Sequence, residues 1–420
     1  MNIASIVQDV LSRTPILDMH THLFPPSFGA LPLWGIDELL RYHYLEAELF
    51  RSSDITPDQY WSMTKQQQAD LIWRTLFVEN APISDAARGV VFVLHSFGLR
   101  TDAPDLTEAR AFFRAQDPKS HVARVLELAG VSEVVMTNDP LDPAEAPFWL
   151  NNAARGPEFL AALRLDRILK GWAEHWSVIE SQGYRVDGAA SGQSTGELRR
   201  FFADWVLRMQ PRYMAVSLPY TFRYPTDDVQ NKLLREAVLP ACREAAIPIA
   251  LMIGPAYQVN PAIRLAGDST GKADIRTVEA ICRDHPCNRF FVTLLSRESQ
   301  HELCVAARKF SNLMPFGCWW FLNNSSIVDE ITRERVEMLG ATMIPQHSDA
   351  RVLEHIIYKW RNSRRVIGQV LADAYQLMAD DGRAPKPQEI ERDIRRMMRG
   401  NFERWTRLER ARGSREAGGR

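Results

Sequence analysis

The chain has 420 residues, of which 45% are hydrophobic, and its 51 Lys and Arg residues nearly balance its 52 Asp and Glu residues. Such a composition is ordinary for a globular protein, and the net charge of −1 indicates neither a nucleic-acid nor a membrane-surface partner. The five cysteines form no CxxC pair or repeated spacing, which favours reduced thiols over disulfides or a cysteine metal site.

The first fifteen residues contain Asp9 and lack the basic start and apolar core of a signal peptide. No apolar run reaches the length that spans a membrane. We therefore expect a cytoplasmic protein.

An apolar run, residues 15–19, ends in two histidines separated by one residue, His20 and His22. Residues i and i+2 of a β-strand point to the same face, so both imidazoles can aim at one point. This spacing is typical of a pair of metal ligands.

Eight short apolar segments of strand character recur along the chain. They are residues 16–19, 133–137, 159–165, 213–218, 247–253, 289–295, 312–320 and 341–345. Between most of these segments lie stretches whose apolar residues recur at helical spacing, and these stretches are residues 196–209, 228–246, 273–284, 298–310 and 326–339. This alternation predicts an α/β protein with a parallel sheet. A TIM-type (β/α)8 barrel with insertions accommodates the whole length as one unit.

Residues 23–130 interrupt the alternation with a loop rich in proline and glycine and then several helical segments. We expect a helical insertion here, after the first strand, that covers the barrel mouth. Two further helices are predicted after the eighth strand, over 351–380 and 386–408. The expected domain is a single barrel over 1–408, followed by a disordered tail, 409–420.

A carboxylate, Asp349, follows the last predicted strand. Strands one and eight are neighbours in a closed barrel, and parallel barrels carry their chemistry at the carboxyl ends of their strands. His20, His22 and Asp349 would then bind one metal ion and leave a coordination position open. The alternative is that the histidines are ordinary polar residues and that Asp349 caps the following helix.

A second candidate pair, His43 and Tyr44, lies in an amphipathic helical segment of the insertion, 36–50. By itself such a pair indicates packing more often than chemistry. Its significance comes from a set of motifs that occur in a defined order along the chain.

In the order in which these residues and the motifs around them occur, the chain resembles the uronate (glucuronate) isomerases of the amidohydrolase superfamily. The motifs that carry the resemblance are His20-Thr21-His22, Arg41-Tyr42-His43-Tyr44, Thr137-Asn138-Asp139-Pro140, Leu163-Arg164-Leu165-Asp166, Trp319-Trp320-Phe321 and Ser348-Asp349-Ala350-Arg351. No single motif is specific, and it is their order over nearly the whole chain that indicates the family.

The resemblance implies a barrel of the metal-dependent hydrolase type that binds one divalent metal ion, zinc first and manganese or another ion second. It implies aldose–ketose isomerisation of a hexuronate, from D-glucuronate to D-fructuronate or from D-galacturonate to D-tagaturonate. His20, His22 and Asp349 would bind the metal. The other implied site residues are Tyr44, His43 and Arg351 with Asp349 in catalysis, and Arg164, Arg351, His43 and Trp320 in substrate binding. A homo-oligomer is also implied.

The chemistry explains these residue types, because moving a proton between C1 and C2 passes through an ene-diolate. We expect Tyr44 or metal-bound water, assisted by Asp349, to move the protons. Arg351 and Arg164 would hold the sugar carboxylate or hydroxyls through their forked donors.

The middle of the barrel departs from the family pattern. Met252 stands where the family has a strand-five His, and Ser217 lies in the strand-four segment where the family has Ser-Asp-His. His347, two residues before Asp349, is a further candidate ligand. Two alternatives therefore remain. One is a mononuclear metal hydrolase or decarboxylase that acts on another carboxylated compound, and the other is a non-catalytic relative that binds sugar acids.

Overall fold

Seven short strands form one parallel sheet at the centre of the protein. The computed structural model describes residues 2–407. The strand order is β1-β2-β3-β4-β5-β8-β9, and every neighbouring pair is parallel. The strands are β1 Ile16–Thr21, β2 Val131–Asn138, β3 Phe159–Arg164, β4 Met214–Leu218, β5 Ile249–Ile253, β8 Phe290–Leu294 and β9 Leu313–Pro315. The curled sheet confirms the predicted α/β class and seven of the eight predicted strand positions.

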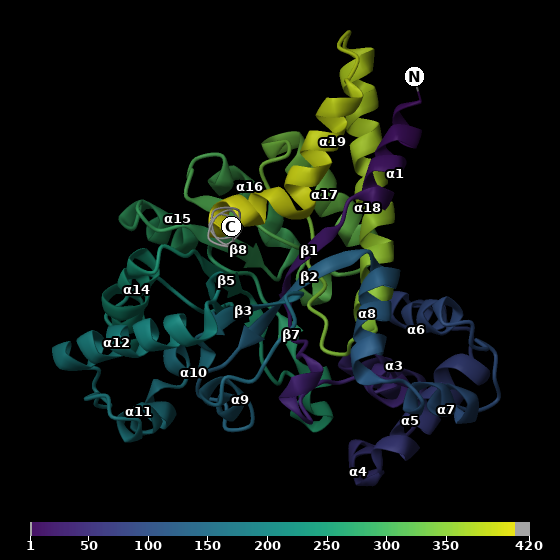
Figure 1. Ribbon diagram of the computed structural model, residues 1–420, viewed down its shortest axis with the longest axis horizontal. Helices are drawn as coiled ribbons and strands as arrows, with labels where there is room; N and C mark the ends of the chain where they lie inside the picture. Colours follow the sequence, from purple (N-terminus) through teal and green to yellow (C-terminus); the bar gives the residue numbers. More distant parts are fainter. Residues whose placement is uncertain (1, 408–420) are drawn as a thin grey trace, which may run out of the picture.

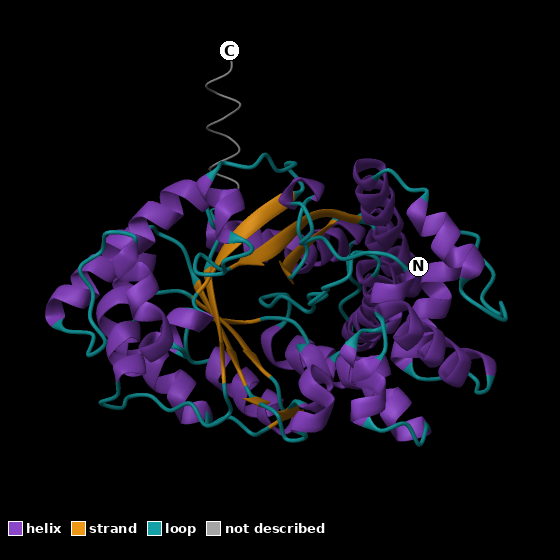
Figure 2. Cartoon of the chain, turned by 90° about the horizontal axis from the view of Figure 1, so that it is seen from below, coloured by secondary structure: helices purple, strands orange, loops and turns teal. Residues whose placement is uncertain are grey.

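The central strands are mostly apolar because both faces of the sheet are covered. All residues of β5 and β8 are buried, as expected for a parallel sheet. Alternate residues join two different apolar clusters: Ala250 and Met252 belong to a smaller one, while Leu251 belongs to the large one that includes the helices. Figure 2 shows the strands in the middle and the helices around them.

The eighth predicted strand, residues 341–345, is not a regular strand. Only Ile344 forms a bridge, with Phe316. Pro345 has no N–H for a ladder, and the carbonyls of Ala341 and Met343 are bound instead by the Asn401 side chain, at 2.8 Å each.

Irregular chain, residues 344–350, nevertheless fills the eighth position. On one side Ile344 N donates to Pro315 O at 3.1 Å and Gly317 N donates to Ile344 O at 2.9 Å. On the other side Asp349 N donates to His20 O at 3.1 Å and His22 N donates to Ala350 O at 2.7 Å. The segment therefore joins β9 to β1.

Helices surround the sheet and form a separate group after β1. The α-helices are α1 Ile3–Arg13, α2 Ile36–Leu40, α3 His43–Ser52, α4 Pro57–Ser62, α5 Lys65–Trp73, α6 Asp85–Ser96, α7 Thr107–Arg114, α8 Pro118–Ala129, α9 Ala146–Leu150, α10 Asp166–Leu169, α11 Trp172–Ser181, α12 Gly192–Met209, α13 Val229–Leu233, α14 Leu239–Glu244, α15 Ile275–Asp284, α16 Gln300–Ala307, α17 Ser325–Leu339, α18 His355–Asp380, α19 Pro387–Arg395 and α20 Asn401–Thr406. A short antiparallel pair, β6 Pro255–Ala256 and β7 Ser269–Thr270, follows β5.

The predicted helical segments correspond to these helices, with local differences. The predicted helix over 228–246 consists of α13 and α14 joined by a π-helical turn, Leu234–Val238. Helices α1, α6, α9, α10 and α11 were not predicted. Local capping sets the ends of α8: the Asp117 side chain accepts from Ser120 N, Pro118 opens the helix, and Gly130 ends it in the left-handed conformation.

The long helix α18 packs against α1, α8 and α17 (Figure 1). Helices α2 to α7 share an apolar cluster of their own, and α3 carries the predicted site residues His43 and Tyr44. The division into one barrel with an insertion over 23–130 stays a prediction. The expected tail, 409–420, lies outside the described residues. Among residues 2–407, no helix is both long and apolar enough to cross a bilayer.

We expect Asn401→Asp to lower the free energy of unfolding by about 1 to 3 kcal/mol. The carbonyls of Ala341 and Met343 would lose their buried donor and face a carboxylate instead. Urea unfolding measures this difference. The exposed Asn152→Asp variant is the matched control and should unfold like the wild type. Equal unfolding of all three proteins would contradict the role assigned to Asn401.

Candidate metal centre and active site

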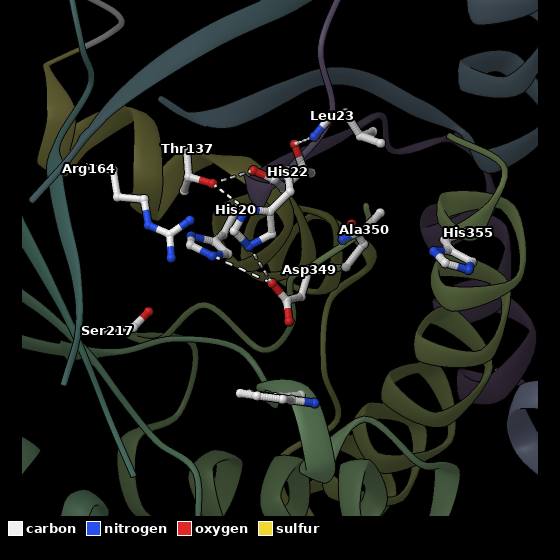
Figure 3. Close-up of polar contacts among 12 residues, drawn as sticks. His20, His22, Leu23, Thr137, Arg164, Ser217, Asp349, Ala350 and His355 are labelled. Atoms are coloured by element: carbon white, nitrogen blue, oxygen red, sulfur yellow. Dashed lines mark hydrogen bonds and ion pairs between the residues drawn. The ribbon is translucent and has the colours of Figure 1, made fainter. Parts of the chain in front are cut away.

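His20, His22 and Asp349 lie together where β1 ends and meets segment 344–350 (Figure 3). Nε2 of His22 lies 3.3 Å, and Nε2 of His20 3.6 Å, from Oδ1 of Asp349. One ligand atom from each residue lies within 4.8 Å of the other two. Within residues 2–407 this is the one cluster of His, Cys, Asp and Glu with such geometry.

The hydrogen bonds of His20 orient its Nε2 lone pair toward Asp349. The Tyr213 hydroxyl donates its single proton to Met19 O at 2.6 Å. Its oxygen lies 3.2 Å from His20 Nδ1, so Nδ1 must be the donor in that contact. The neutral His20 ring then carries its lone pair on Nε2.

His22 is oriented in the same way by Thr137, at the end of β2. The Thr137 hydroxyl donates to Thr21 O at 3.0 Å and lies 2.9 Å from His22 Nδ1. Nδ1 of His22 is therefore the donor, and its Nε2 is unprotonated. Outer contacts of this kind fix the tautomer of metal-binding histidines in general.

The charges at the cluster favour a cation. Burial lowers the pKa of His22 to about 4 and holds the pKa of His20 well below its ordinary value, so both rings are neutral near pH 7. Burial alone would raise the pKa of Asp349, but its interactions with His22 first, and then with His20 and His347, outweigh burial and hold that pKa below its ordinary value. A buried carboxylate thus faces two nitrogen lone pairs, and Oδ1 has no hydrogen-bond donor among residues 2–407. These donor atoms fit a divalent metal ion.

His43 and Tyr44 are both held by Trp320, in the loop after β9. Nε1 of Trp320 donates to His43 Nε2 at 2.9 Å, and the Tyr44 hydroxyl donates to Trp320 O at 2.9 Å. Nδ1 of His43 is consequently the protonated nitrogen, and it is buried without an acceptor among residues 2–407. Burial lowers the pKa of His43 to about 3 and raises that of Tyr44 well above its ordinary value. Both groups are uncharged donors near pH 7.

A cavity of about 420 Å³ opens beside His22 and is lined by Thr137, Arg164 and Arg351. The Arg164 side chain points toward the two imidazoles (Figure 3) but is paired with Asp166 at 3.0 Å. The Arg351 guanidinium makes no hydrogen bond or ion pair with any residue of the described chain. Arg351 is therefore the cation of this cavity that is free to meet an anion.

The predicted substrate-binding residues do not all line the same cavity. His43, Tyr44 and Trp320 are absent from the lining of the larger cavity. Tyr44 instead lines a smaller one, of about 40 Å³, together with Lys359. Trp320 is 9% exposed and stacks on Phe321, so its visible role is to hold His43 and Tyr44.

The strand-five departure is a packing change. Met252 is 1% exposed and belongs to the smaller apolar cluster with Trp319 and Trp320. His347 is fully buried beside His20, with ring centroids 5.2 Å apart, but lies outside the three-residue cluster. Both of its ring nitrogens lack partners among residues 2–407.

The overall fold is similar to several crystal structures. A uronate isomerase from Bacillus halodurans C-125 is 47% identical, with 96% of each chain covered and a TM-score of 0.94. This chain belongs to the uronate isomerase family. More distant similarity, at 16% identity, extends to a uronate isomerase from Thermotoga maritima, with 96% of this chain and 97% of that one covered and a TM-score of 0.78. A glucuronate isomerase from Caulobacter crescentus is also 16% identical, over 97% and 94% of the two chains, with a TM-score of 0.71. No family model and no curated sequence matches the chain.

Four residues that support the site in this family member were not predicted as site residues: Thr137, Tyr213, Asp18 and Lys359. Thr137 occurs in a motif that indicated the family, and Asp18 shares the i, i+2 spacing of His20 and His22. Tyr213 and Lys359 come from remote segments, and no local pattern distinguishes them.

We expect Thr137→Val to weaken metal binding about 10- to 100-fold, because His22 Nδ1 loses the acceptor that sets its tautomer. Competition with a chromophoric chelator measures the dissociation constant. Thr137→Ser keeps the hydroxyl and is the matched control. Equal affinities of the Val and Ser variants would contradict the orienting role.

The metal-free protein should lose stability as the pH falls from 7 to 4.5. The unfolded chain protonates His43 near pH 6.5, whereas the folded protein protonates it only near pH 3. The unfolded state therefore binds more protons over this window, and the free energy of unfolding falls with pH. His43→Gln keeps an acceptor for Trp320 and should make the dependence shallower by about 1.4 kcal/mol per pH unit below pH 6. Parallel curves from urea unfolding would contradict the assignment.

Proposed function

We propose that the protein is a metal-dependent aldose–ketose isomerase acting on a hexuronate. The substrates would be D-glucuronate, giving D-fructuronate, or D-galacturonate, giving D-tagaturonate. The observation that carries the proposal is a pair of oriented imidazoles facing a buried carboxylate, beside Arg351, which has no partner within the described part of the chain, in a member of this family. Two nitrogen donors and one carboxylate favour zinc, with manganese as the second choice.

His20, His22 and Asp349 would hold the ion, which would supply Lewis-acid stabilisation of negative charge on the sugar oxygens. Conversion of the aldose to the ketose moves one proton from C2 to C1 and another from the C2 hydroxyl to the C1 oxygen. Asp349 is ionised and can accept a proton. Tyr44 and His43 keep theirs near neutral pH, and they would act as donors to the sugar oxygens, His43 through Nδ1, which is unpartnered within residues 2–407, and Tyr44 by releasing its hydrogen bond to Trp320 O.

Arg351 would bind the sugar-acid carboxylate, because its forked donors are not engaged by another residue. Arg164 already has Asp166 as a counter-charge and would contribute a weaker, shared contact. Trp320 is assigned to positioning His43 and Tyr44. No observation favours hydrolysis, decarboxylation or a purely binding role.

Family membership alone supports a homo-oligomer as part of this proposal. A cytoplasmic location is supported by the cysteines, since all five are free thiols.

The test is ketose formation from D-glucuronate and D-galacturonate by the zinc-loaded protein. Asp349→Asn should abolish turnover and weaken metal binding, because the amide cannot supply the negative charge or accept the proton. Asp204→Asn, on α12 and paired with Tyr184, is the control and should retain wild-type rates. Full activity of the Asp349 variant, or no ketose from either uronate with wild-type protein, would reject the proposal.

A further inference from the structure

The main chain of Ser348, next to Asp349, is held from both sides by two buried side chains, the carboxyl group of Asp18 and the ammonium of Lys359. Ser348 N donates to Asp18 Oδ1 at 3.0 Å, and Lys359 Nζ donates to Ser348 O at 2.6 Å. Asp18 is fully buried and Lys359 is 4% exposed. The second carboxylate oxygen of Asp18 accepts from Trp360 Nε1 at 2.8 Å. Two successive residues of α18 therefore hold this segment: Lys359 binds Ser348, and Trp360 binds Asp18.

Asp349 needs such support because its backbone is not in a regular strand. Its φ is +50°, in the left-handed region that non-glycine residues seldom adopt. The peptide group between Ser348 and Asp349 is fixed at both ends, by Lys359 on the carbonyl and by His20 O on the N–H. These two contacts determine where the Asp349 carboxylate can point.

Lys359 also contacts the element that carries the other predicted catalytic residues. Its Nζ lies 5.6 Å from the centroid of the Tyr42 ring, and Tyr42 is the N-cap residue of α3. The ammonium has three donors, and one of them is used by Ser348. Burying an ammonium group costs free energy unless it has partners. The Ser348 carbonyl and the Tyr42 ring are such partners for Lys359.

We propose that Lys359 is a positioning residue that, together with Asp18 on the other side of the Ser348 main chain, aims the Asp349 carboxylate at the metal. The inference rests on the metal site of the proposed function. It adds that α18 sets the affinity of that site without contributing a ligand.

The test measures Zn²⁺ alone, by competition with a chromophoric chelator, on metal-free protein. Lys359→Met keeps the length of the side chain and removes the ammonium, and we expect the dissociation constant to rise about 10- to 100-fold. Lys359→Arg keeps a buried cation with donors and should recover part of the affinity. Ile367→Val, also buried on α18 and remote in sequence from residue 359, is the packing control.

A merely structural Lys359 would lower the midpoint of thermal unfolding, as Ile367→Val does, and leave Zn²⁺ affinity unchanged. That result, or equal affinities of the Met and Arg variants, would overturn the inference. If Lys359→Met does not fold, Lys359→Gln replaces it under the same criteria. Failure of the wild type to bind Zn²⁺ would instead reject the metal site itself, and the inference with it.

Discussion

Closure of the barrel between β1 and residues 344–350 is the constraint on which the site depends. Two backbone hydrogen bonds across this seam, from Asp349 N to His20 O and from His22 N to Ala350 O, bring a carboxylate beside two imidazoles that are over 300 positions away in the chain. The seam is irregular rather than a strand pair. Its geometry is therefore set by side chains from other elements, Asn401 and Lys359 among them.

The charge balance of the site follows from burial. The imidazoles remain neutral because burial disfavours the imidazolium, while the interactions of Asp349 with His22, His20 and His347 hold the pKa of its carboxyl group below its ordinary value. The resulting negative, lone-pair-rich pocket is unfavourable without a cation. The hydroxyl groups of Thr137 and Tyr213 accept from the Nδ1 atoms of His22 and His20, and so leave the lone pair of each ring on Nε2.

The site occupies one side of the barrel. Its polar groups come from β1, β2, β3, α3, the loop after β9 and residues 344–351, whereas β5 contributes packing through Met252. The departures from the family pattern at strands four and five thus lie in strands that contribute no residue to the cluster of His20, His22 and Asp349. The 47% identity to the Bacillus halodurans uronate isomerase spans 96% of this chain, so these departures occur within a shared fold.

The sequence by itself determined the alternation of strands and helices, the family and the three residues of the His20, His22 and Asp349 cluster, because hydrophobic periodicity and short motifs are local properties. Only the tertiary structure decided that the eighth strand is irregular, that Arg351 has no partner among residues 2–407, and that Lys359 donates to the Ser348 carbonyl next to Asp349. These features arise from contacts between segments far apart in the chain. Pairing and burial depend on three-dimensional neighbours, which no local pattern of residue types records.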